Sequence, residues 1–83
     1  MTFFVYILKS IKDTRLYIGQ TNNLENRLLR HNSGKVTATK NRRPFTVVYK
    51  EEYLSRTEAM QREKYLKSLK GDLERKLNIK FEN

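Results

Sequence analysis

The sequence predicts one α+β domain over all 83 residues, in which three strands and three helices follow the order ββαβαα. Two apolar runs, residues 3–8 and 16–20, are separated by seven residues, a spacing that suits an antiparallel hairpin. A third run at 45–49 is β-branched and aromatic, as strands are. Two further segments, residues 24–32 and 55–70, repeat apolar residues with helical spacing.

The first helix has a recognisable beginning and end. Capping-type residues, of which Asn23 is the last, precede residue 24, and Gly34 ends the helix. Residues 35–43 are polar, basic and without a hydrophobic period, so we expect a loop there, which Pro44 ends.

The second helix begins at a capping box. Residues 55–58 read Ser-Arg-Thr-Glu, a pattern that marks a helix start, and the helix is expected to run to about residue 70. Asp72 is expected to cap a short last helix over 73–77. We expect the tail at 79–83 to fray.

Composition excludes several kinds of site. The chain has no cysteine and one histidine, so disulfides, thiol nucleophiles and Cys/His metal cages are excluded. Any metal must be held mainly by oxygen ligands, which favours Mg²⁺ or Mn²⁺. The longest apolar run, at 3–8, is far too short to cross a membrane, and no cleavable signal pattern follows it. A reducing cytoplasm is therefore the expected location.

The chain is strongly basic. Eighteen Lys and Arg against nine Asp and Glu give a net charge of +9, which favours a polyanionic partner such as nucleic acid. A solvated basic surface and a ribosome-associated protein are the alternatives. Charge does not distinguish DNA from RNA.

Both predicted long helices carry polar groups among their apolar residues. On a helical wheel Arg27 and His31 share one arc with Leu24 and Leu28. Such groups are rarely buried without partners.

In the second helix Glu63 lies between Ala59 and Leu66 on the apolar stripe. One interpretation is a polar site shared by the two helices. The other is a plain Arg27–Glu63 ion pair at the edge of the core, which would do no chemistry.

These residues fall into an ordered set of motifs. They read V-Y-I at 5–7, Y-I-G at 17–19, T-N-N-L-x-x-R-L-x-x-H-N at 21–32 and A-x-x-x-E-x-x-L-K at 59–67. The set resembles the GIY-YIG nuclease family, in particular its short single-domain members of the UPF0213 and excinuclease-like kinds. Val5 stands where the family has its leading glycine. The resemblance implies a small three-stranded antiparallel sheet flanked by helices.

The resemblance also implies phosphodiester hydrolysis with one divalent metal ion. Glu63 matches the metal-binding carboxylate, and Arg27 matches the arginine that faces the scissile phosphate. Tyr17 matches the tyrosine proposed to position or deprotonate the attacking water, and Tyr6 matches the second signature tyrosine. His31 matches the histidine of the short members, which could assist proton transfer or bind phosphate.

Each assignment has a structural alternative. Tyr6 and Tyr17 could be aromatic residues that pack the hairpin, and His31 could be a helix residue favoured by the dipole near a C-terminus. Gly19 could serve only the turn, although we expect it to let a substrate backbone approach closely. Asn78 is the nearest counterpart of an asparagine that closes the site in larger members.

Binding is expected to fall to basic side chains that contact phosphates rather than base edges. These residues are Lys35, Lys40, Arg42, Arg43, Lys64, Lys67 and Lys70. The predicted function is a Mg²⁺- or Mn²⁺-dependent DNA endonuclease, guided by structure or weakly by sequence, in repair or recombination. The alternatives are a DNA- or RNA-binding module with this fold but little or no activity, and a structural protein bound to the ribosome or another partner.

Overall fold

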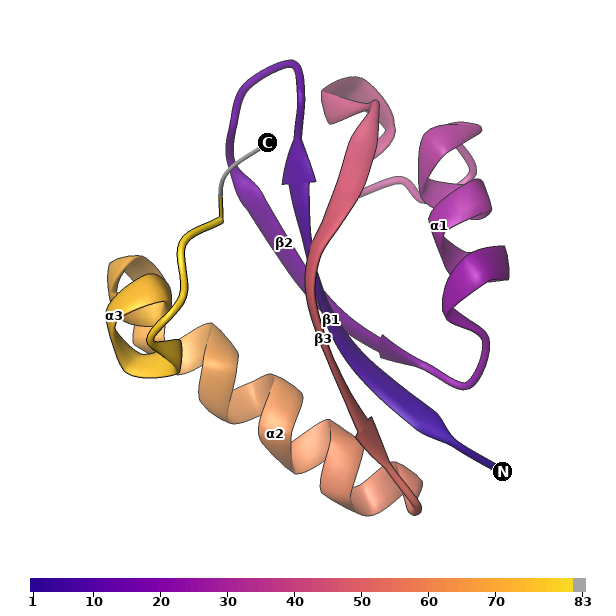
Figure 1. The fold of residues 1–83 in the computed structure, drawn as a ribbon. Helices are drawn as coiled ribbons and strands as arrows, with labels where there is room; N and C mark the ends of the chain where they lie inside the picture. The colour runs from indigo at the N-terminus through magenta and orange to yellow at the C-terminus, as the bar shows by residue number, and fades with distance from the viewer. Residues whose placement is uncertain (82–83) are drawn as a thin grey trace.

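The computed structural model describes residues 1–81 and shows the predicted α+β architecture (Figure 1). The order ββαβαα is confirmed. Its elements are β1 (Phe3–Ser10), β2 (Leu16–Thr21), α1 (Leu24–Asn32), the 3₁₀ turn η1 (Lys40–Arg42), β3 (Phe45–Tyr53), α2 (Arg56–Leu69), the 3₁₀ turn η2 (Lys70–Asp72) and α3 (Leu73–Leu77).

The three strands form one antiparallel sheet in the order β2-β1-β3, so the apolar β1 lies at its centre. Tyr6 of β1 lies opposite Gly19 of β2 and Lys50 of β3. Helix α1 covers one face of the sheet, and α2 and α3 cover the other (Figure 1). Because side chains alternate along a strand, β1 supplies a core to each face.

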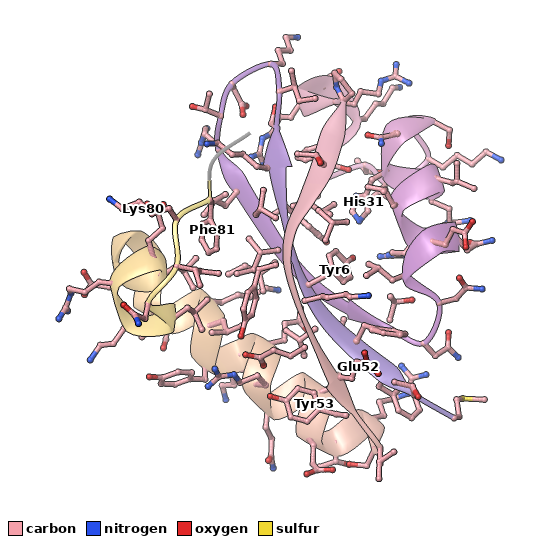
Figure 2. All side chains as sticks on the ribbon, viewed as in Figure 1. Tyr6, His31, Glu52, Tyr53, Lys80 and Phe81 are labelled. Atoms are coloured by element: carbon pink, nitrogen blue, oxygen red, sulfur yellow. The ribbon has the colours of Figure 1, made fainter. Side chains whose placement is uncertain are left out.

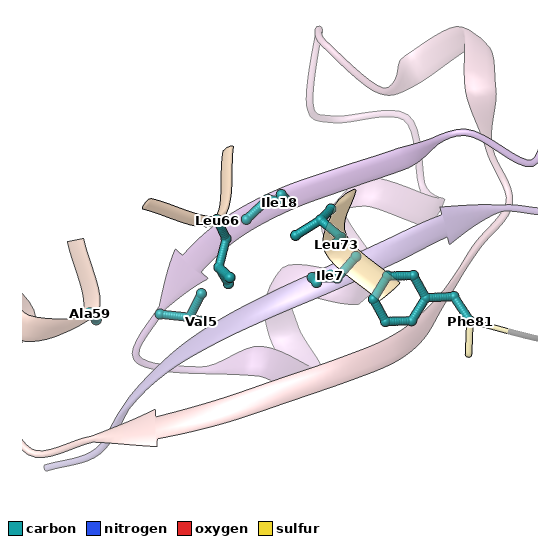
Figure 3. Packing of buried hydrophobic residues seen from close by; sticks show 7 residues of the cluster. All are labelled: Val5, Ile7, Ile18, Ala59, Leu66, Leu73 and Phe81. Carbon is teal, nitrogen blue, oxygen red and sulfur yellow. The ribbon is translucent and has the colours of Figure 1, made fainter. Parts of the chain in front are cut away.

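The core on the α2 side is entirely apolar (Figure 3). It is built from Val5, Ile7, Ile18, Ala59, Leu66, Leu73 and Phe81. Val5, which replaces the family's leading glycine, is fully buried here and leaves Tyr6 pointing to the opposite face.

The core on the α1 side is aromatic and smaller. Tyr6, Leu8 and Phe45 are buried, and Leu24 and Leu28 of α1 pack against them. This face therefore buries a phenol completely, whereas Tyr49 and Tyr53, which pack against the other core, are only partly buried.

Local capping explains why the helices begin where predicted. The Asn23 side chain accepts a hydrogen bond from the Asn26 amide at 3.0 Å, and the Ser55 hydroxyl accepts one from the Glu58 amide at 3.2 Å. Gly34 has φ +81°, the left-handed conformation that ends α1.

Several predicted boundaries differ from those in the structure, and β1 ends at Ser10 rather than at residue 8. β3 extends to Tyr53 rather than residue 49, and the loop at 35–43 contains the turn η1. α3 begins after Asp72 as predicted, but that carboxylate binds Arg75 at 3.1 Å and makes no capping hydrogen bond.

The prediction of a frayed tail is wrong for residues 79–81. Phe81 is only 4% exposed and packs in the core on the α2 side. Its amide donates to Glu74 at 2.7 Å, and its carbonyl accepts from Lys9 at 2.8 Å. A buried aromatic ring outweighs the entropy of a chain end. Residues 82–83 of the same prediction lie outside the described residues.

In residues 1–81 we find no helix with the length and apolar character needed to span a bilayer.

Candidate active site

Tyr6 and His31 form the centre of the site, between the sheet and α1 (Figure 2). The Tyr6 hydroxyl and His31 Nε2 are 3.2 Å apart, and both residues are almost completely buried. β1 supplies the tyrosine, and the last turn of α1 supplies the histidine. The apolar arc of the first helix therefore does carry a buried polar residue, as the sequence predicted.

Gly19 makes room for this tyrosine. A Cβ atom at residue 19 would collide with the Tyr6 hydroxyl and lie 2.6 Å from Tyr6 Cζ. Gly19 is itself buried, so its space is taken by the protein's own phenol. The structure thus gives a reason for glycine that sequence reasoning missed, and a role of Gly19 toward nucleic acid stays a prediction.

His31 is a neutral imidazole held on all sides. Burial, together with the nearby positive charges of Arg27 and Arg30, lowers its pKa to about 4. Nδ1 lies 2.8 Å from the Thr39 hydroxyl, and the ring packs edge-on against Tyr17 with centroids 4.9 Å apart. At neutral pH the ring is therefore uncharged, and it lies within the protein rather than at its surface.

Arg27 lies beside both signature tyrosines. Interaction with the Tyr6 hydroxyl raises the pKa of Arg27, and Tyr17 adds to this effect. Burial raises the pKa of Tyr6, which Arg27 opposes and Tyr17 and Glu63 reinforce. Both shifts keep the ordinary charge states, a cationic arginine and a neutral phenol.

The Nε atom of Arg27 is buried and has no hydrogen-bond partner within residues 1–81. Other partly buried arginines in this range are paired with carboxylates, Arg42 with Asp13 and Arg62 with Glu51. Leaving a buried donor unsatisfied costs about 1–3 kcal/mol. Arg27 therefore differs from Arg42 and Arg62 in having no carboxylate partner among residues 1–81.

Glu63 is on α2, which covers the opposite face of the sheet from α1. Its carboxylate forms an ion pair with Lys67 at 2.9 Å and is 20% exposed. Among the described residues no ion pair joins Glu63 to Arg27, so the structural alternative of a plain Arg27–Glu63 pair is wrong. The negative charge of Glu63 is the smallest of the influences that raise the pKa of Tyr6, after burial and Tyr17.

Tyr17 connects the two halves of the site at the β2 edge. It packs against His31 on the α1 side, and it lines a hollow of about 300 Å³ with Lys67, the partner of Glu63. Leu16, Ile18 and Leu73 complete the lining. Tyr17 is only partly buried, so a ligand in this hollow could reach it.

The predicted phosphate-binding cations fall into two groups. Lys35, Lys40, Arg43, Lys64 and Lys67 are exposed, and Lys67 pairs with Glu63. Arg42 differs, because it binds the Asp13 carboxylate at 3.0 Å and stacks on Phe45 at 5.5 Å from the ring centroid. The side chain of Lys70 lies outside the described residues.

Asn78 does not line the tyrosine site that the structure shows. It ends α3 in the left-handed conformation, with φ 56°, and is exposed.

Thr39 is a buried neighbour of the site that sequence reasoning missed. It lies in the basic segment after α1 and is fully buried, with its hydroxyl on His31. The segment has no hydrophobic period, so no sequence signal singles out this threonine.

Of the predicted site residues, only Glu63 carries a carboxylate, the type of ligand that a hard divalent cation such as Mg²⁺ prefers. Within residues 1–81 no three His, Asp or Glu residues gather as a metal cage. Glu63 could bind one ion whose remaining ligands are waters and phosphate oxygens, an arrangement that suits Mg²⁺.

Comparison with known proteins agrees with the motifs. Residues 2–78 match the family model described as the GIY-YIG catalytic domain. A UPF0213 protein of Staphylococcus haemolyticus is 48% identical over 66 residues, which are 78% of this chain and 79% of that protein. The UPF0213 protein YazA of Bacillus subtilis is 43% identical over 67 residues, 80% of this chain and 67% of that protein.

A solved structure is also similar. The solution NMR structure of a UPF0213 protein from Bacillus halodurans is 36% identical, with a TM-score of 0.57. The match covers 93% of this chain and 82% of that one.

Proposed function

The chain belongs to the GIY-YIG family, and from that membership we propose that it is an endonuclease that hydrolyses DNA phosphodiesters with one Mg²⁺ or Mn²⁺ ion. The net charge of +9 suits a nucleic-acid substrate. The exposed cations would contact phosphates, so substrate choice would depend on nucleic-acid shape more than on base sequence.

The observation that carries the proposal is that Arg27 has no carboxylate partner among residues 1–81. A partly exposed guanidinium beside two phenols, with no carboxylate partner among residues 1–81, fits an anion supplied from outside. Donors fixed in advance at the place where negative charge grows stabilise a phosphoryl-transfer transition state. Arg27 would donate to the oxygens of the scissile phosphate.

The other residues take roles that follow from their accessibility. Tyr17 lines the β2-edge hollow and would orient the attacking water. Tyr6 is buried and would hold Arg27, while His31, neutral and buried, would hold Tyr6. Glu63 would bind the metal ion, which when bound supplies Lewis-acid stabilisation of the phosphate.

A nucleic-acid-binding module without turnover is the second candidate. The observation that favours it is the Glu63–Lys67 ion pair, because this pair must open before the carboxylate can bind a metal ion. Lys67 is 55% exposed, and exposed pairs of this kind contribute only about 0.3–0.5 kcal/mol. That cost is small, so the ion pair is a weak argument against metal binding, and the enzyme is the better-supported candidate.

The test is cleavage of a panel of linear, nicked and branched DNA and of RNA, with Mg²⁺ or Mn²⁺ and with EDTA. We expect metal-dependent cutting that EDTA abolishes. Arg27→Ala and Glu63→Ala should each lower the rate roughly 100-fold or more. Arg75→Ala and Glu52→Ala, which remove exposed charges of the same types, are the matched controls and should cut normally.

Two results would contradict the proposal. Retained cleavage in both Arg27→Ala and Glu63→Ala would show that the site is elsewhere. Salt-sensitive binding of DNA or RNA without cleavage under any metal condition would favour the binding module.

A further inference from the structure

A line of hydrogen-bonding groups leads from the basic segment after α1 to the site. It runs from the Val36 carbonyl to the Thr39 hydroxyl at 3.4 Å, then to His31 Nδ1 at 2.8 Å. From His31 Nε2 it continues to the Tyr6 hydroxyl at 3.2 Å. Thr39 and His31 are both fully buried, so no solvent competes for these bonds.

The carbonyl at one end favours one direction for these bonds. A carbonyl oxygen can only accept, so at the 3.4 Å contact the Thr39 hydroxyl is the donor; the same carbonyl also accepts from the Thr39 amide at 3.1 Å. A hydroxyl that donates to Val36 offers its lone pairs to His31. His31 Nδ1 must then carry the hydrogen. A neutral imidazole has one N–H, so Nε2 accepts and the Tyr6 hydroxyl donates to it.

This direction matters for Arg27. Because the Tyr6 hydroxyl points its hydrogen at His31 Nε2, the lone pairs of the Tyr6 oxygen are left to face the guanidinium of Arg27. In the Nε2–H tautomer, His31 would donate to the Tyr6 oxygen. The hydrogen of the Tyr6 hydroxyl would then have to point away from the imidazole ring. One orientation open to it faces the cationic Arg27, which repels a hydrogen-bond donor.

We propose that Thr39 is a positioning residue, which fixes the Nδ1–H tautomer of His31 and thereby aims the Tyr6 oxygen at Arg27. The effect on cleavage rests on the proposed nuclease function. The tautomer itself does not, because it can be observed in the resting protein.

The first measurement is the two-bond ¹H–¹⁵N correlation spectrum of the imidazole at neutral pH. His31 is the only histidine of the chain, so the spectrum contains a single ring. We expect a protonated Nδ1 and an unprotonated Nε2. A protonated Nε2 in the parent protein would overturn the proposal, whether or not the protein cuts DNA.

The second measurement compares Thr39→Val, which keeps the shape and removes the hydroxyl, with Thr39→Ser, which keeps the hydroxyl. In Thr39→Val we expect Nε2–H to become the main tautomer. The kcat for cleavage should fall about 10- to 100-fold with KM little changed, because a displaced catalytic group slows the chemical step. Thr39→Ser should retain the parent tautomer and rate.

The outcomes separate the two hypotheses. Retention of the Nδ1–H tautomer in Thr39→Val would overturn the role of Thr39. A tautomer change with unchanged cleavage would overturn its link to Arg27. If the parent shows the Nδ1–H tautomer but cleaves nothing, the nuclease proposal fails while the assignment of Thr39 to the histidine stands.

Discussion

Gly19→Ala tests whether the close packing of Tyr6 over β2 matters for the site. The added Cβ would lie 2.6 Å from Tyr6 Cζ and 3.2 Å from Cε1. Ordinary carbon contacts begin near 3.4 Å, so the ring must retreat by about 0.8 Å. Tyr6 is 1% exposed and cannot swing into solvent. The displacement therefore falls on its 3.2 Å contact with His31 and on Arg27.

Two free-energy terms set the expected loss of stability. Overpacking a buried site destabilises the folded protein by about 1–3 kcal/mol. Replacing glycine by alanine also lowers the conformational entropy of the unfolded chain, which stabilises the folded protein by roughly 0.4–1 kcal/mol. We expect a net loss of about 1–2 kcal/mol, which lowers Tm by roughly 5–15 °C for a domain of this size. Since a misplacement near 1 Å can cost about 100-fold in rate, cleavage should fall by a similar factor below the Tm.

The assay combines thermal unfolding, followed by circular dichroism, with single-turnover cleavage. Gly71→Ala is the matched control, because a Cβ at that exposed glycine meets nothing within 4 Å. The control should change stability by less than about 0.5 kcal/mol and leave the rate unchanged. A Gly19→Ala protein that unfolds and cuts like the parent would refute the inferred packing. One that loses stability but cuts normally would refute the role of Tyr6.

Two further predictions concern residues outside the site. Hydrogen bonds from Arg62, Tyr49 and Tyr53 outweigh burial and hold the pKa of Glu51 below its ordinary value of 4.5. This stabilisation is therefore present above about pH 4.5 and is lost as the pH falls through the lowered pKa. Glu51→Gln should cost about 1–3 kcal/mol at pH 7 and less at pH 3, measured by urea unfolding; an equal cost at both pH values would contradict the assignment. Phe81→Ala should cost about 3 kcal/mol with cutting retained below its Tm, and a cost under 1 kcal/mol would show that the ring does not pack as described.

The parts of the fold that were predictable are those with local causes. The capping residues Asn23 and Ser55 and the stop at Gly34 act within a few residues of the helix ends that they define. The end of β3 has no local cause. Residues 50–52 are charged, which suggests a loop, but Glu51 finds its partner Arg62 eleven positions later on α2. Such a pairing exists only after the helix has docked.

The site, like the fold, was predictable only where the sequence carries a local signal. A cation and a histidine on the apolar arc of α1 stand out against its periodicity, and the structure does bury His31. Thr39 has no such signal, since a threonine in a polar loop is ordinary. What distinguishes it is burial and a 2.8 Å contact with His31, which depend on how the loop folds back over α1.

The position of Glu63 depends on the neighbouring residue of α2. Ala59 and Leu66 face the sheet, and at 100° per residue Arg62 and Glu63 project on opposite flanks of that stripe. Arg62 binds Glu51 through two nitrogens, at 2.9 and 3.0 Å, which ties its flank to β3. Glu63 must then project toward β2, where its partner Lys67 shares the hollow with Tyr17. The ion pair that extends β3 therefore also sets the direction in which the helix presents its carboxylate.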